Sequence, residues 1–183
     1  MKISISTLSR WLEGDDAYEL SRWLEGDAHV KQDWIKRLSL RATRFDKPLY
    51  RLMSVPKSSN AKQGTIYKVT GQSELVSASD KINAAVYAGC QWLHDVDKDL
   101  TDSKLLLVRL IEPVVCATHK QIMDALAAYP NLGRSGHVGI RTKNEREYIV
   151  RAKNLKGVIL YHTEDCQYVL NDDHKQLLKS LHK

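Results

Sequence analysis

The sequence predicts an α+β protein in which a helical N-terminal segment, residues 1–42, precedes a strand-rich body, residues 43–183. In the N-terminal segment, apolar residues recur at helical spacing and the runs end at glycine. In the body, short runs rich in Val, Ile, Leu and Tyr alternate with amphipathic helical stretches. Helices followed mainly by strands are typical of an α+β architecture.

The N-terminal segment contains a tandem repeat, because "LSRWLEGD" stands at 8–15 and again at 20–27. Leu8, Trp11 and Leu12 have the spacing of one helical face, and the glycine of each copy is a stop signal. On one continuous helix the two copies would be rotated by about 120°. Two short helices instead let both Trp-Leu pairs face a common core. We therefore expect packing helices, with a docking surface for a partner as the alternative.

The body is predicted from runs of β-branched and aromatic residues bounded by turn residues. Strands are expected at 48–54, 64–70, 73–79, 145–153 and 156–165, with a further short strand at 166–170. The run 104–115 is expected to form a strand that stops near Pro113. Helices are expected at 81–95, 118–129 and 172–183. The longest apolar run, Leu105–Ile111, is far shorter than the roughly 20 residues of a membrane helix and contains Arg109. It is predicted to be a buried strand, and no membrane association is expected.

Composition points to a globular protein of a reducing compartment. The apolar fraction of 43% suffices for a core. The three cysteines lie far apart and the N-terminus has no apolar signal region, so a cytoplasmic location is expected. The net charge of +6 favours an acidic partner, and nucleic acid is one option. The basic residues are spread along the chain rather than clustered, which favours a solvated basic surface.

Two glutamates stand out in "RTKNEREYIVRAK", residues 141–153. On an extended strand Glu145 and Glu147 would share one face, about 6–7 Å apart. Neighbouring carboxylates raise the proton affinity of one of them. This arrangement suits a site in which one carboxylate stabilises developing positive charge and the other acts on a nucleophile. The alternative is a pair of surface glutamates beside lysines.

Two further motifs precede the glutamates. Arg51 lies within the apolar run "LYRL", where an arginine usually needs an anionic partner. Ser77 and Ser79 end the run "LVSAS" and precede an alanine-rich helix. In this order, "YR", "SAS" and "ERE" resemble the arginine-specific mono-ADP-ribosyltransferases of the R-S-E class over residues 48–162. The family usually has threonine where this chain has Ala78.

The resemblance implies a split β-sheet core and NAD as the substrate, with no metal. Arg51 is then the partner of the NAD pyrophosphate. Tyr50, Ser77 and Ser79 complete the implied NAD-binding residues, with Ser77 in the nicotinamide-ribose site.

The implied catalytic residues are Glu147, Glu145 and Ser77. Glu147 binds the ribose and stabilises the oxocarbenium-like transition state as nicotinamide leaves, while Ser77 helps to hold it. Glu145 orients and deprotonates the acceptor guanidinium, which hardly loses a proton at neutral pH without a nearby base.

The resemblance also implies a target protein that carries an acceptor arginine. Small bacteriophage transferases that modify host proteins are similar in size and layout, so a host transcription or translation component in the host cytoplasm is one such target. Two alternatives stay open. One is a basic protein that binds nucleic acid or a host factor without catalysis, although clustered charge and interleaved aromatics are lacking. The other is an NAD glycohydrolase, in which water replaces the acceptor.

A metal site is not expected from the sequence. Cys90 and His94 are four residues apart on an expected helix, but no second pair of ligands stands nearby.

Overall fold

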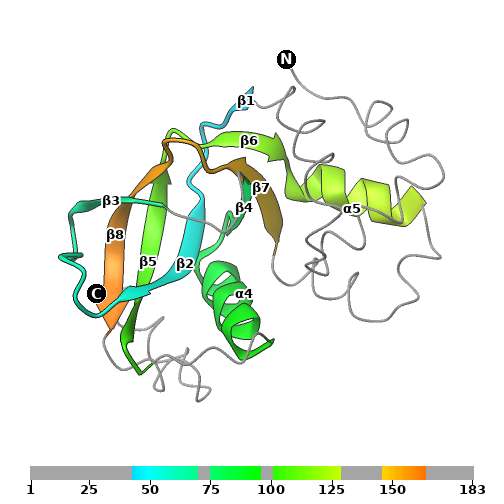
Figure 1. Ribbon diagram of the computed structural model, residues 1–183. Helices are drawn as coiled ribbons and strands as arrows, with labels where there is room; N and C mark the ends of the chain where they lie inside the picture. Colours follow the sequence, from blue (N-terminus) through cyan, green and yellow to red (C-terminus); the bar gives the residue numbers. More distant parts are fainter. Residues whose placement is uncertain (1–42, 70–74, 96–100, 129–145, 164–183) are drawn as a thin grey trace. The chain divides into compact units, whose positions relative to one another are not determined.

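The computed structural model describes residues 43–69, 75–95, 101–128 and 146–163, and these form a strand-rich α+β structure (Figure 1). The strands are β1 (Thr43–Arg44), β2 (Tyr50–Pro56), β3 (Ile66–Lys68), β4 (Leu75–Ser79), β5 (Ser103–Ile111), β6 (Val114–Ala117), β7 (Glu147–Arg151) and β8 (Lys156–Thr163). The helices are α4 (Ile82–Asp95) and α5 (His119–Ala128). The tandem repeat, the expected strand at 166–170 and the expected C-terminal helix lie outside the described residues.

The strand expected to stop near Pro113 ends at Ile111, and a separate strand that was not expected, β6, follows it. The break lies at Glu112, whose φ is 43°, and at Pro113, which has no backbone N–H to donate to a sheet. The left-handed residue turns the chain, so β6 leaves β5 and pairs antiparallel with β7 and β1.

The described residues belong to two compact units. The first contains residues 43–45, 75–77, 114–128 and 146–153, with the strand order β1-β6-β7-β4. The second contains residues 46–69, 78–95, 101–113 and 154–163, with the strand order β4-β2-β5-β8-β3. Strand β4 contributes Leu75–Ser77 to the first unit and its last two residues to the second.

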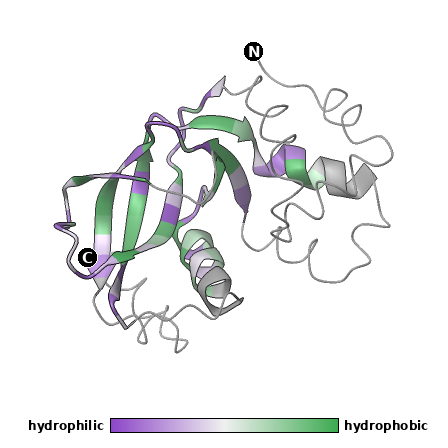
Figure 2. Cartoon of the chain, viewed as in Figure 1, coloured by the Kyte–Doolittle hydropathy of each residue, from purple (hydrophilic) through white to green (hydrophobic). Residues whose placement is uncertain are grey.

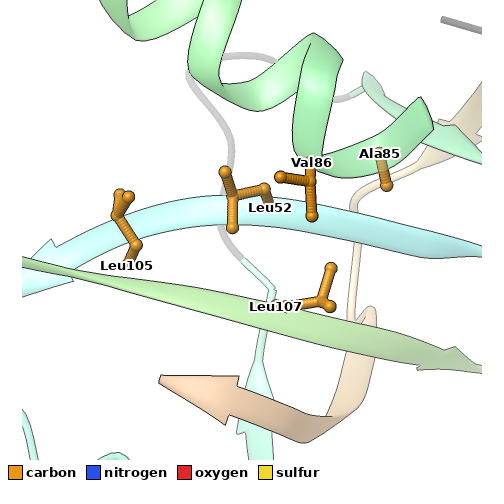
Figure 3. Packing of buried hydrophobic residues seen from close by; sticks show 5 residues of the cluster. All are labelled: Leu52, Ala85, Val86, Leu105 and Leu107. Carbon is orange, nitrogen blue, oxygen red and sulfur yellow. The ribbon is translucent and has the colours of Figure 1, made fainter. Parts of the chain in front are cut away.

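The core of the second unit forms where α4 packs against β2. Its buried cluster consists of Leu52, Ala85, Val86, Leu105 and Leu107 (Figure 3). Gly89 of α4 makes this packing possible, because a Cβ there would lie 2.6 Å from Cβ of Leu52. Figure 2 shows the long hydrophobic stretch of β5 that supplies the strand side of this core.

A buried lysine anchors the β2–β3 loop in the same unit. Lys104 is 5% exposed, and its Nζ donates hydrogen bonds to the carbonyl oxygens of Ser59 at 2.6 Å and Ala61 at 3.3 Å. The backbone N–H of Ala61 donates in turn to Oγ of Ser59. A buried charge is costly unless its donors are satisfied, so these carbonyls both solvate the lysine and hold the loop.

In the first unit, α5 packs against β7. Thr118 and Gln121 form a reciprocal cap at its N-terminus, since each backbone N–H donates to the other residue's side-chain oxygen. Tyr148 of β7 packs against the rings of Phe45 and His119, with centroids 5.3 and 6.5 Å away. Within the described ranges, neither helix combines the length and the apolar character needed to cross a membrane.

Candidate active site

Strand β4 presents the serine motif on a buried support. Leu75, Val76, Ala78 and Ser79 are buried, and Ser77 is exposed. Only the hydroxyl of Ser77 is therefore presented to solvent, on a strand whose neighbouring residues are fixed by packing. Such a rigid support orients a side chain more precisely than a loop does.

Ser77 contacts one of the two predicted catalytic glutamates. Its Oγ donates a hydrogen bond to Oε1 of Glu147, although 70 positions separate the two residues in sequence. Both residues belong to the first unit, and Glu147 is half-buried as the first residue of β7. This is the contact that the family resemblance implies. It holds a half-buried carboxylate of the first unit in contact with an exposed serine.

The expectation that Glu145 and Glu147 share one face of an extended strand is wrong, because β7 begins only at Glu147. Arg146 lies in a turn with φ of 48°, in the left-handed region. Alternate residues point to the same face only where the backbone between them is extended. The extended backbone that the expectation assumed is therefore absent at Arg146, and Glu145 itself lies outside the described residues.

The arginine motif lies on β2, in the second unit. Tyr50 pairs with Ser79 of β4 on one side and with Arg109 of β5 on the other. Strand β4 thus carries Ser77, bonded to Glu147, and two residues later Ser79, paired with Tyr50.

Arg51, the next residue on β2, is half-buried and pairs with Val108. Because residues alternate between faces, Arg51 lies on the face of β2 opposite to Leu52 and α4. The Nε atom of its guanidinium is buried. A half-buried guanidinium interacts more strongly with an anion than a fully solvated one.

The cysteines in the described ranges have the properties of packing residues. Burial raises the pKa of the Cys90 thiol to about 11. Burial also raises the pKa of Cys116 to about 11, although the nearby Arg151 lowers it. Such thiols stay protonated at neutral pH and are poor nucleophiles. Among the described residues, no group of three or more His, Cys, Asp or Glu is arranged to hold a metal. The side chain of His94, which the sequence analysis considered with Cys90, lies outside the described side chains.

The left-handed conformation at Arg146 was missed by the sequence analysis, which expected an extended strand there. Glycine, asparagine and aspartate are the usual residues at positive φ, and an arginine there carries no recognisable signal. The turn nonetheless decides where β7 begins, and so it places the glutamate that Ser77 contacts.

Searches of protein-family models, of curated proteins and of solved structures found no match to this chain.

Proposed function

We propose that this protein is a mono-ADP-ribosyltransferase that moves ADP-ribose from NAD to an arginine of a target protein. The observation that carries the proposal is the hydrogen bond from Ser77 to Glu147. It joins the second and third of the three motifs on which the family resemblance rests. Ser77 is the exposed residue of an otherwise buried strand, and its hydroxyl engages Glu147 of β7, the neighbouring strand in the sheet.

Glu147 is the residue that acts on NAD. The bond between the nicotinamide nitrogen and C1′ of the ribose breaks, and nicotinamide leaves with the bonding electron pair. Positive charge then develops on the ribose, and a carboxylate held in place stabilises it without reorganising. Ser77 keeps the Glu147 carboxylate in one orientation by occupying one of its two oxygens.

Arg51 binds the NAD pyrophosphate. The guanidinium is always charged and presents two parallel N–H groups to two oxygens of an anion. Its position among buried residues of β2 limits its rotamers, which lowers the entropy cost of binding. Tyr50 and Ser79, paired across β2 and β4, complete the NAD-binding residues in this proposal.

Glu145 acts on the acceptor. A guanidine nitrogen of the target arginine forms the new bond to C1′, and the proton that it loses passes to the Glu145 carboxylate. The finer fold that accompanies this function is the split β-sheet core of the family. The strand-rich described residues are compatible with it.

The test is transfer of label from NAD labelled in its adenylate part. We expect wild-type protein to label a discrete protein in a cell lysate and to release an equal amount of nicotinamide. The matched control is Glu147→Gln, which is nearly isosteric and should do neither. Nicotinamide release without protein labelling in any lysate would point to the glycohydrolase instead. If the wild-type protein neither releases nicotinamide nor labels a protein, the proposal is contradicted.

A further inference from the structure

Three neighbouring strands of the second unit place six side chains on one face of the sheet. Directly opposite residues in antiparallel strands point to the same face, as do residues i and i+2. One cross-strand row consists of Ile66, Val158 and Arg109, and the next consists of Lys68, Lys156 and Ile111. We call these six residues the β3–β8–β5 patch. The three strands lie side by side in Figure 1.

Apolar side chains in this patch are exposed to an unusual degree. Ile66 is 63% exposed and Ile111 is 37% exposed. They are two of the three large hydrophobic side chains that are exposed in the described part of the chain, and the third is Tyr87 of α4. Exposed apolar residues that gather between charged ones mark interaction surfaces more often than isolated ones do.

The charges of the patch all have one sign. Lys68, Lys156 and Arg109 are exposed, and no acidic residue occupies any of the six positions. Lys68 and Lys156 lie directly opposite each other, an arrangement that destabilises a sheet because like charges repel. An anionic group placed across these strands would relieve that repulsion, so the patch is complementary to a ligand of negative charge.

The chemistry of the patch favours a protein over a nucleic acid. Surfaces that bind single-stranded nucleic acids present aromatic rings on which bases stack. Here the apolar positions are Ile66, Ile111 and Val158, which cannot stack on a base but do pack against aliphatic side chains. The partner must therefore combine carboxylates with apolar side chains at short spacing.

We propose that the β3–β8–β5 patch is a docking surface for an extended acidic segment of a partner protein. Strand β3 is the last strand in the order of its unit. An added strand on that side would place alternate residues beside Ile66 and Lys68, which calls for alternating apolar and acidic side chains. The inference does not rest on the proposed transferase activity, because none of the six residues belongs to the candidate active site.

The experiment measures binding of a fluorescein-labelled peptide with a repeated Glu-Thr-Val-Thr sequence to the full-length protein by fluorescence anisotropy. Glutamate and valine fall on the same face of this peptide when it is extended. We expect saturable binding that weakens as salt is raised. Replacing glutamate by glutamine, or valine by serine, should weaken binding of the respective peptide.

Two double variants distinguish an effect of the patch itself from an effect of the protein's net charge. Lys68→Glu with Lys156→Glu should weaken binding by about tenfold or more, because two attractions become repulsions. Lys57→Glu with Lys81→Glu makes the same change of charge at two exposed lysines outside the patch, and a much smaller effect is expected. Ile66→Ser, which keeps the charge, should also weaken binding. Circular dichroism would show that each variant keeps its fold.

Equal weakening by the two double variants would overturn the proposal, since binding would then follow net charge alone. Absence of saturable peptide binding to the wild-type protein would overturn it as well. A third contrary outcome is a labelled oligouridylate that binds more tightly than the peptide, competes with it and loses affinity in the patch variant. That result would assign the same residues to nucleic acid.

Discussion

The hydroxyl of Ser77 in β4 donates a hydrogen bond to the carboxylate of Glu147, the first residue of β7. The two strands are far apart in sequence, and each presents its polar residue next to buried neighbours. Burial of Leu75 and Val76 fixes the strand that carries the serine, while burial of Tyr148 fixes the strand that begins at Glu147. The position of the carboxylate is therefore set by packing in the first unit, and the hydrogen bond sets its orientation.

The first prediction separates charge from orientation at this contact. Glu147→Gln removes the charge and should abolish nicotinamide release, since electrostatic stabilisation of this kind is worth roughly 3–4 kcal/mol. Ser77→Ala keeps the charge but frees the carboxylate to rotate, so a smaller loss is expected. Ser58→Ala, at an exposed loop serine, is the control and should leave the rate unchanged. Equal rates for Ser77→Ala and wild type would show that the bond has no catalytic role.

Most of the element types in the described body could be predicted from the sequence. Short apolar runs between turn residues indicated the longer strands, and the helical spacing in Ile82–Asp95 indicated a helix. The end of the long strand near Pro113 was predicted, but the turn at Glu112 that leads into β6 and the turn at Arg146 could not be. Both depend on a left-handed residue that is not glycine, and its conformation is imposed by the tertiary structure rather than by local preference.

The candidate site was predictable only in part for the same reason. Motif order identified Ser77 and Glu147, and the structure brings them into contact. The spatial relationship of Glu145 to Glu147 depended on the assumption of an extended backbone, which fails at Arg146. A rule for strand faces applies only once the first residue of the strand is known.

A second prediction concerns Arg51. Arg51→Ala should weaken NAD binding strongly, and Arg51→Lys should restore only part of the affinity, because lysine keeps the charge but loses the planar fork. The measurement is isothermal titration with NAD, in parallel with thermal unfolding of each variant. Full affinity in Arg51→Lys would rule out a bidentate contact. Unchanged affinity in Arg51→Ala would make the arginine a structural residue of β2.

A third prediction tests the close approach of α4 to β2. Replacing a helical glycine by alanine usually stabilises a protein by roughly 0.5–1 kcal/mol. At Gly89 the same replacement should instead lower the free energy of unfolding, because the new Cβ would lie 2.6 Å from Cβ of Leu52. Overpacking of this kind costs roughly 1–3 kcal/mol.

The measurement is the free energy of unfolding in urea for Gly89→Ala, Leu52→Ala and the double variant. Leu52→Ala alone leaves a cavity in the cluster beneath α4 and is destabilising by itself. The double variant should be more stable than the sum of the two single effects predicts, since truncating Leu52 removes its outer side-chain atoms from the crowded contact. Strict additivity would mean that the contact with Cβ of Leu52, which alanine retains, accounts for the whole cost. A Gly89→Ala variant as stable as the wild type would contradict the close packing.

A fourth prediction concerns the left-handed turn at Arg146. Arg146→Gly and Arg146→Asn should preserve the turn, because both residues adopt positive φ at low cost. Arg146→Val should be destabilising, since β-branched residues are outliers in that region. If Arg146→Val also lowers nicotinamide release more than Arg146→Gly does, the turn positions Glu147. If Arg146→Gly instead loses more nicotinamide release than Arg146→Val, the side chain of Arg146 matters rather than its backbone conformation.

The last prediction concerns the separate roles of Glu145 and Glu147. In the proposed mechanism Glu147 acts on NAD, so its replacement by glutamine should stop both transfer and hydrolysis. Glu145 acts on the incoming guanidinium, so Glu145→Gln should lose arginine modification while retaining slow release of nicotinamide to water. The two variants make the same chemical change two residues apart, so each is the control for the other. Because Ser77 holds the Glu147 carboxylate, the residual hydrolysis of Glu145→Gln should fall further in the double variant Glu145→Gln with Ser77→Ala. The measurement is nicotinamide release and protein labelling, side by side, at neutral pH.

Parallel loss of both activities in both single variants would contradict the division of roles but would not contradict the NAD site. Normal labelling by Glu145→Gln would instead make Glu145 a surface charge and argue against arginine as the acceptor.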